Sequence, residues 1–229
     1  GYLFMEMRTG KSWTVLEAIK RVAQKKIHNP FPLLIVAPKT PCIATWPYEL
    51  EMAGFNMAKV CNLSGLSTAK TKKALEEQTD KRIFIINYEK IVPSDILEDY
   101  KWNCVVLDES VRVAKHTAKV TREVMATLPR NRYQMRVALS GAPAGEGYFS
   151  LICQRLSTDG EIGGEREYFR HLKKKWKHNI YLHRWDPRAG TIGEVDKWLG
   201  ENTYRITQKQ AGVASERMYT RMVLPLPEK

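Results

Sequence analysis

The sequence predicts an α/β fold in which helices cover both faces of a doubly wound parallel sheet. Short, unbroken apolar runs recur through residues 1–140, as do the strands of a parallel sheet that is buried on both faces. Between them lie segments whose apolar residues recur at helical spacing, so the chain alternates between strand and helix. This alternation implies right-handed βαβ crossovers. With 229 residues, of which 43% are hydrophobic, the chain is long enough for one large domain.

The predicted strands are apolar runs that end at proline, glycine or polar residues. In chain order they are 2–5, 33–37, 60–63, 83–86, 104–107 and 136–140. Two later segments, 203–207 and 218–224, are predicted to be strands that return to the same core. Helices are predicted after Lys11, at 43–53, at 68–78 and at 117–128. Trp46 has helical spacing with Leu50, so we expect it to lie in the core.

The alternation stops near residue 155. Residues 157–165 are rich in glycine and acidic residues and are predicted to form a loop. The segment 170–185 is densely basic and carries Trp176 and Trp185. We therefore divide the chain into a core at 1–156, a basic helical insertion or subdomain at 157–200, and return strands at 201–229.

Two motifs suggest nucleotide chemistry. Gly10-Lys11-Ser12 follows the first predicted strand and offers backbone N–H groups, an ammonium and a hydroxyl to a triphosphate and its Mg²⁺. The first glycine of the G-x-x-x-x-G-K-[ST] pattern is replaced by Met5. Asp108-Glu109 ends a predicted buried strand, where one carboxylate can hold the metal through water and the other can polarise an attacking water. Together the motifs favour a P-loop ATPase.

Ligands of doubly wound sheets bind at the carboxyl ends of the strands. Four polar segments of this chain follow predicted strands in that way. They are Gly10-Lys11-Ser12, Pro38-Lys39-Thr40, Asp108-Glu109 and Ser140-Gly141. We expect these segments to converge on one edge of the sheet.

Charge and composition bear on partners and compartment. The chain has 37 Lys and Arg against 25 Asp and Glu, a net charge of +12, which favours a polyanion such as nucleic acid but also fits a protein that is merely basic. The cysteines are far apart, with no C-x-x-C pair, and suit reduced thiols in a cytosolic protein; they are Cys42, Cys61, Cys104 and Cys153. No apolar stretch has the length of a membrane span, and no signal peptide is present, so no membrane partner is expected.

Because the chain opens directly on a strand-like run without Met, we expect it to be a fragment whose N-terminus lies upstream.

In this order the motifs resemble the N-terminal, RecA-like motor lobe of superfamily 2 helicases, specifically the Swi/Snf-like DNA-dependent ATPases, with spellings similar to phage-type members. The resemblance spans nearly the whole chain. The matching segments are 5–12 (MEMRTGKS), 34–39 (LIVAPK) with Trp46 and Glu49, 86–89 (INYE), 106–112 (VLDESVR), 139–143 (LSGAP) and 204–207 (YRIT), the last of which closes the first lobe.

The resemblance implies roles for the nucleotide-binding residues. Lys11 would neutralise the β- and γ-phosphates of ATP, and Ser12 and Asp108 would hold Mg²⁺. Glu109 would orient and deprotonate the attacking water. The loop residues Arg8, Thr9 and Gly10 would surround the phosphates.

The resemblance also implies contacts with DNA. Ser140 and Gly141 would couple the nucleotide state to the DNA side. Lys39 and Thr40 would contact a phosphate of duplex DNA; the alternative is that they form a solvated strand end.

The basic segment suggests a further contact from its own composition. The run Lys173, Lys174 and Lys175 could grip the backbone while Trp176 or Trp185 stacks, although a solvated basic helix with an inward-facing tryptophan explains this cluster equally well.

The chain departs from the family pattern in three places. Arg8 replaces a loop glycine, so its side chain points either toward the phosphates or away from them. Ser110-Val111 replaces Ala-His, which puts the usual coupling to the second lobe in doubt. The second RecA-like lobe, with its arginine finger, is absent from this chain.

Three alternatives remain open at the level of the sequence. A P-loop nucleoside or nucleotide kinase would share the phosphate loop but would not explain Pro38-Lys39-Thr40 or 140–143. The ATPase domain of a phage DNA-packaging terminase shares the phosphate loop, the acidic pair and a coupling motif. A nucleotide-gated DNA-binding module would bind ATP with little turnover.

Overall fold

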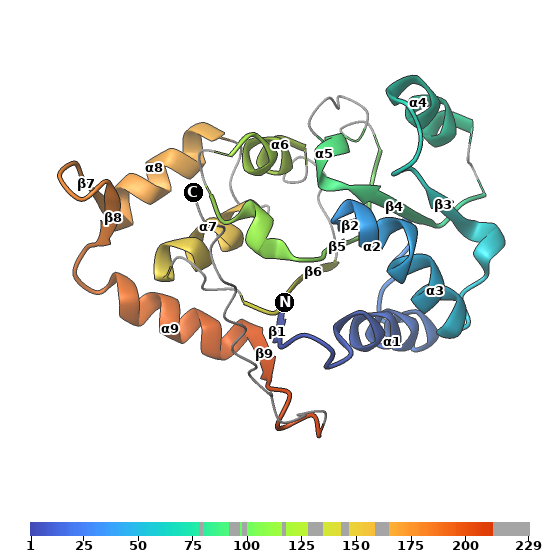
Figure 1. Cartoon of the computed structure of the whole chain (residues 1–229), viewed down its shortest axis with the longest axis horizontal. Helices are drawn as coiled ribbons and strands as arrows, with labels where there is room; N and C mark the ends of the chain where they lie inside the picture. Colours follow the sequence, from blue (N-terminus) through green and yellow to red (C-terminus); the bar gives the residue numbers. More distant parts are fainter. Residues whose placement is uncertain are drawn as a thin grey trace, which may run out of the picture.

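The structure is a computed structural model of the whole chain. It describes residues 1–77, 80–91, 97, 100–115, 118–127, 135–142, 147–158 and 165–212. Seven strands form one parallel sheet in the order β3-β4-β2-β5-β6-β1-β9, and β7 and β8 form a separate antiparallel hairpin (Figure 1). The predicted fold class, α/β with a doubly wound parallel sheet, is confirmed.

The strands of the sheet are the predicted apolar runs, with ends that differ by one residue at most. They are β1 (Tyr2–Met5), β2 (Leu33–Ala37), β3 (Val60–Asn62), β4 (Ile83–Asn87), β5 (Cys104–Leu107), β6 (Met135–Ser140) and β9 (Thr203–Ile206). The hairpin strands are β7 (Trp176–Asn179) and β8 (Arg184–Pro187). The strand predicted at 218–224 lies outside the described residues.

The helices are α1 (Lys11–Gln24), α2 (Lys39–Ile43), α3 (Thr45–Met52), α4 (Thr68–Glu77), α5 (Tyr88–Ile91), α6 (Lys119–Thr127), α7 (Tyr148–Thr158), α8 (Glu165–Lys175) and α9 (Thr191–Asn202), with single 3₁₀ turns η1 (Met57–Lys59) and η2 (Ser110–Val113). Two short helices, α2 and α5, occupy segments that the sequence indicated only as strand ends. Pro41 is tolerated in α2 because it lies in the first turn, where its missing N–H costs no hydrogen bond.

Alternate residues of the central strands enter two different hydrophobic clusters. Ile35 packs with α1, α2 and α3 on one face of the sheet, together with the fully buried Trp46. Val36, the next residue, packs on the other face with α4, α5 and α6. Both faces are therefore covered, which explains why the strands read as unbroken apolar runs.

A third cluster joins the later part of the chain to β1. Leu172 and Trp176 lie in this cluster with Tyr2, whose ring centroid is 4.7 Å from that of Trp198 in α9. The described part of the predicted insertion thus shares apolar core with the sheet, while α8 and the β7–β8 hairpin form one end of the molecule (Figure 1). Within the described residues, no helix is both long and apolar enough to cross a membrane.

Candidate nucleotide and nucleic-acid site

The loop between β1 and α1 has the backbone of an anion-binding site. Gly10 precedes α1 with a left-handed φ of 81°, and no described side chain caps the helix. The first turn of α1 carries no acidic residue, so the N–H groups and the positive end of its dipole face an anion unopposed. Arg8, exposed and with φ 63°, holds a left-handed conformation at the position where the family pattern has glycine.

Lys11 lies where the ends of β1 and β6 meet. Its Nζ donates a hydrogen bond to the carbonyl of Met5 at 3.2 Å and makes a second, longer contact with the carbonyl of Glu6 at 3.5 Å. Gly141 is next to it, because a Cβ on Gly141 would sit 3.6 Å from the same Nζ. The structure therefore brings together the predicted phosphate lysine and one of the predicted coupling residues.

Asp108 is buried and is held from two sides. The indole N–H of Trp46 donates to Oδ2 at 3.0 Å, and the backbone N–H of Glu109 donates to Oδ1 at 3.0 Å. The hydroxyl of Tyr88 donates to the backbone carbonyl of Asp108 at 2.7 Å. The prediction that Trp46 lies in the core is confirmed, but its bond to Asp108 was not foreseen.

Three carboxyl groups crowd this part of the site, and the pKa of each is raised. Burial raises the pKa of Asp108, against the lowering effect of Trp46, the Glu109 N–H and Lys11. Burial and the charge of Asp108 raise the pKa of Glu109, opposed by Lys11 and Arg112. The pKa of Glu49 rises for the same two reasons, and among the described atoms its Oε2 is buried without a hydrogen-bond partner. The site thus carries more negative charge than its described lysine and arginine balance.

A divalent cation fits this excess of carboxylate charge. The donors are hard oxygens, which Mg²⁺ prefers. No three acidic, histidine or cysteine side chains are placed to bind a metal within the described ranges. Mg²⁺ typically keeps several waters and takes one or two protein oxygens plus substrate phosphates, so its binding does not need a cluster of three protein ligands.

Ser140 is fully buried, and its Oγ accepts a hydrogen bond from the N–H of Ala142 at 3.3 Å. This bond shapes the turn after β6. A second buried serine, Ser110, donates to Oε1 of Gln154 in α7 at 2.7 Å and so ties the loop after β5 to that helix. Sequence reasoning missed Gln154, since nothing in a helix pattern marks a partner 44 residues away.

The predicted DNA contacts lie in two separate places. Lys39 and Thr40 are exposed at the start of α2, after β2. Burial lowers the pKa of Lys90 in α5, and so does the charge of Lys39, which shows that the two lysines lie near each other. The Nζ of Lys90 donates a hydrogen bond to the carbonyl of Leu63 at 3.0 Å. Lys90 therefore belongs to the same basic edge as Lys39, although no sequence pattern marks it.

The second basic group lies at the end of α8, in the other half of the molecule from α2 (Figure 1). Lys173 and Lys174 are exposed. Lys175 donates to both carboxylate oxygens of Glu194 at 2.6 Å. Trp176 is buried, so it packs inward, as expected if this cluster is a solvated basic helix.

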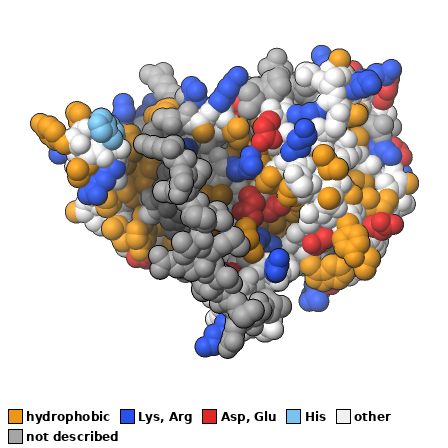
Figure 2. Space-filling view, in the orientation of Figure 1, with side chains coloured by type: hydrophobic (Ala, Val, Ile, Leu, Met, Phe, Trp, Pro, Cys, Tyr) orange, Lys and Arg blue, Asp and Glu red, His pale blue; other side chains and the backbone are white. Residues whose placement is uncertain are grey.

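In the space-filling view acidic side chains gather near the centre of the face, with Lys and Arg side chains around them (Figure 2).

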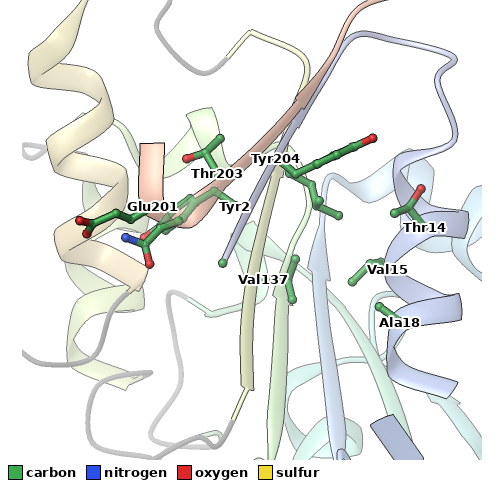
Figure 3. Close-up of a pocket in the computed structure, with 11 residues that line it drawn as sticks. Tyr2, Thr14, Val15, Ala18, Val137, Glu201, Thr203 and Tyr204 are labelled. Atoms are coloured by element: carbon green, nitrogen blue, oxygen red, sulfur yellow. The ribbon is translucent and has the colours of Figure 1, made fainter. Parts of the chain in front are cut away.

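A cavity of about 470 Å³ lies between α1 and the β1–β9 edge of the sheet (Figure 3). Thr14, Val15 and Ala18 line it from the helix, and Tyr204 from β9. It also reaches Gly1 and Tyr2, at the start of β1, whereas the phosphate loop follows the end of that strand. None of the candidate site residues lines this cavity.

Comparisons with known proteins show which family this chain resembles. The sequence model of the SNF2-related domain matches residues 1–152. The TATA-binding protein-associated factor BTAF1 of Arabidopsis thaliana is 29% identical over 141 residues, which cover 60% of this chain and 7% of that protein.

Two solved structures share the fold. The Sulfolobus solfataricus SWI2/SNF2 ATPase core in complex with dsDNA has a TM-score of 0.67 and 18% identity, covering 93% of this chain and 41% of that one. The Sulfolobus solfataricus SWI2/SNF2 ATPase core domain has a TM-score of 0.61 and 16% identity, covering 93% of this chain and 40% of that one. This chain therefore spans less than half of either structure and a small part of BTAF1. Since the family model covers more than half of the sequence, the chain belongs to the SNF2-related domain family.

Proposed function

We propose that this chain is the ATP-binding N-terminal motor lobe of a DNA-dependent ATPase of the helicase or translocase type, which hydrolyses ATP with Mg²⁺ to move on or remodel DNA. One observation carries the proposal. Lys11 and the pair Asp108-Glu109 follow β1 and β5, which flank β6 in one sheet, and the charge of Lys11 reaches both carboxylates. Family membership and a structural neighbour solved with dsDNA support it.

The phosphate end of ATP would bind at the start of α1. Lys11 would exchange its bonds to the carbonyls of Met5 and Glu6 for phosphate oxygens. The hydroxyl of Thr9 already donates to the carbonyl of Glu6 at 2.7 Å, so Thr9 would offer its backbone N–H instead. Ser12 and Asp108 would hold Mg²⁺, which when bound neutralises charge on the phosphates.

Glu109 is the proposed general base. Burial and the charge of Asp108 raise its pKa, which makes its carboxylate a better proton acceptor than that of an ordinary glutamate. Its φ of 50° lies in the left-handed region, a strained backbone conformation that is common at functional sites. Turnover would also use an arginine finger from a second RecA-like lobe.

DNA would bind by charge. The surplus of +12 supplies non-specific attraction, and Lys39, Thr40 and Lys90 offer cations and a hydroxyl to phosphates at the edge beside the nucleotide site. Lys173 and Lys174 would add a second contact from α8.

Calorimetry with Mg·ATP tests the nucleotide assignment. Lys11→Ala should abolish binding in a folded protein, because the variant loses the cation at the phosphates. Lys25→Ala, which removes an exposed lysine just beyond the far end of the same helix, should bind like the wild type. Unchanged ATP affinity in folded Lys11→Ala would rule out this phosphate site.

In the complete two-lobe protein, Glu109→Gln should bind ATP but not hydrolyse it, since an amide cannot accept the proton of water. Near-normal turnover of ATP in this variant would place the general base elsewhere.

A further inference from the structure

We propose that Trp46 and Tyr88 are positioning residues that clamp Asp108 and connect it to the basic edge formed by Lys39 and Lys90. This inference rests on the proposed function, in which Asp108 holds Mg²⁺. It goes further in two ways. It names the residues that hold this carboxylate in place, and it names the elements through which a polyanion bound at the basic edge would change the position of Asp108.

The first arm of the clamp acts on the side chain. Trp46 is fully buried, and its indole N–H reaches Oδ2 of Asp108 across 62 residues of sequence. The N–H of Glu109 occupies Oδ1, so both carboxylate oxygens carry a protein hydrogen bond. Rotation of the carboxylate would break at least one bond in a buried setting, where replacement by water is restricted.

The second arm acts on the backbone. Tyr88, also fully buried, donates its hydroxyl to the Asp108 carbonyl at 2.7 Å. Burial is the largest cause that raises the pKa of this hydroxyl, which therefore stays a donor at neutral pH. With side chain and carbonyl held from two different elements, Asp108 can neither turn nor shift independently of α3 and α5.

Each clamp residue lies close in sequence to a lysine of the basic edge. Lys39 starts α2, and only Ala44 separates that helix from α3, which carries Trp46. Lys90 stands two residues after Tyr88 in the single turn of α5. Arg112 of η2 also bonds Glu89 at 2.8 Å, so α5 is tied to the segment that follows Asp108. A phosphate that displaces either lysine would move an element that is hydrogen-bonded to Asp108.

The bond of Trp46 is not a general consequence of burying an indole in this protein. Trp102 and Trp176 are buried as deeply, yet their Nε1 atoms have no hydrogen-bond partner among the described residues. Trp102→Phe is therefore a matched control for Trp46→Phe, since both remove a buried indole but only one removes a bond to Asp108.

The first test measures Mg²⁺ dependence rather than turnover. A fluorescent ADP analogue is titrated into each folded variant at increasing Mg²⁺ and in EDTA. Trp46→Phe and Tyr88→Phe should need about tenfold more Mg²⁺ or above, as is typical when a residue that hydrogen-bonds a metal ligand is replaced, with unchanged affinity in EDTA. Trp102→Phe should match the wild type. In an Asp108→Asn background, Trp46→Phe should have no further effect on Mg²⁺ dependence.

A wild-type Mg²⁺ requirement in both Trp46→Phe and Tyr88→Phe would overturn the clamp. Failure of the wild type itself to bind the nucleotide would instead overturn the proposed function, and the clamp with it. If Trp46→Phe does not fold, Tyr88→Phe alone decides, because it keeps the ring and removes only the hydroxyl.

The second test addresses the connection to the basic edge. In ¹H–¹⁵N spectra the indole resonance of Trp46, assigned by its loss in Trp46→Phe, should shift when duplex DNA is added, while that of Trp102 stays in place. The shift should be reduced in Lys39→Ala at equal saturation with DNA. A Trp46 resonance that does not respond to saturating DNA would overturn the connection.

Discussion

At the scale of single residues, two non-glycine residues of the site hold left-handed backbone conformations. Arg8 has φ 63° and Glu109 has φ 50°. Such a conformation costs an ordinary residue roughly 1–2 kcal/mol. In both places the strain falls on a residue assigned to ATP chemistry, as is common at functional sites.

Replacing Glu109 with Gln should stabilise the nucleotide-free protein at neutral pH. Because the folded pKa of Glu109 is raised, the folded protein is most favoured when this group is protonated and loses stability as pH rises through that pKa. Gln avoids the loss, so we expect a higher Tm than that of the wild type at neutral pH, and a difference that shrinks as pH falls through the ordinary range of glutamate. Thermal unfolding between pH 4 and pH 8 measures this.

Glu17→Gln is the control for that prediction. The hydrogen bond from Arg21 lowers the pKa of Glu17, so removing its charge should give no gain at neutral pH. A Glu109→Gln gain that persists unchanged at pH 4 would contradict the assigned cause.

At Arg8 the left-handed backbone predicts an unusual order of stability. Arg8→Gly should be more stable than Arg8→Ala by about 1 kcal/mol, because only glycine adopts this φ without a steric penalty. At Lys25, where φ is −76°, the order should reverse, and Ala should be the more stable. Urea unfolding of the four variants measures both differences. Equal stability of the two Arg8 variants would show that the loop relaxes.

At the scale of elements, the two short helices after β2 and β4 put lysines at one edge of the sheet. Helices of four or five residues are not stable on their own, so packing holds α2 and α5 in place. The buried side chain of Cys42 anchors α2, and those of Tyr88 and Ile91 anchor α5. Tertiary packing therefore brings Lys39 and Lys90 to the same edge.

Lys39→Ala and Lys90→Ala should each weaken binding of duplex DNA at all sequences and reduce the slope of log K against log salt by about 1. Lys175→Ala should have a smaller effect, because its ammonium already pairs with Glu194. Fluorescence anisotropy from 50 to 200 mM salt measures the slopes. An unchanged slope in both edge variants, with a reduced slope in Lys173→Ala, would move the DNA to α8.

The sequence predicted the strands of the sheet and the edge where the motifs meet. Runs such as 33–37 can be recognised because burial on both faces leaves no room for polar residues. It did not predict α2 or α5, whose formation depends on packing rather than on local pattern. Nor could periodicity show that Trp46 bonds Asp108, or Ser110 bonds Gln154, because side-chain pairing between distant elements is set by the tertiary structure.

At the scale of the whole molecule, the carboxyl edge of one sheet carries the proposed nucleotide contacts and the first group of proposed DNA contacts, Lys39, Thr40 and Lys90. The segment after β6 is joined to the same sheet through the cluster around Tyr2 and Trp198. The proposed function leaves one requirement outside this chain, the arginine finger of a second lobe. That group is worth roughly 10³–10⁵-fold in rate, which Lys11 and a metal ion acting on bound nucleotide do not replace.

A steady-state ATPase assay on residues 1–229 at low salt, with and without duplex DNA, tests this account most directly. The account predicts that the chain binds the DNA weakly, loses it steeply as salt rises, and shows almost no turnover that DNA increases. Robust stimulation of ATP hydrolysis by DNA would contradict it, because the finger would then lie within this chain or be supplied by a second copy.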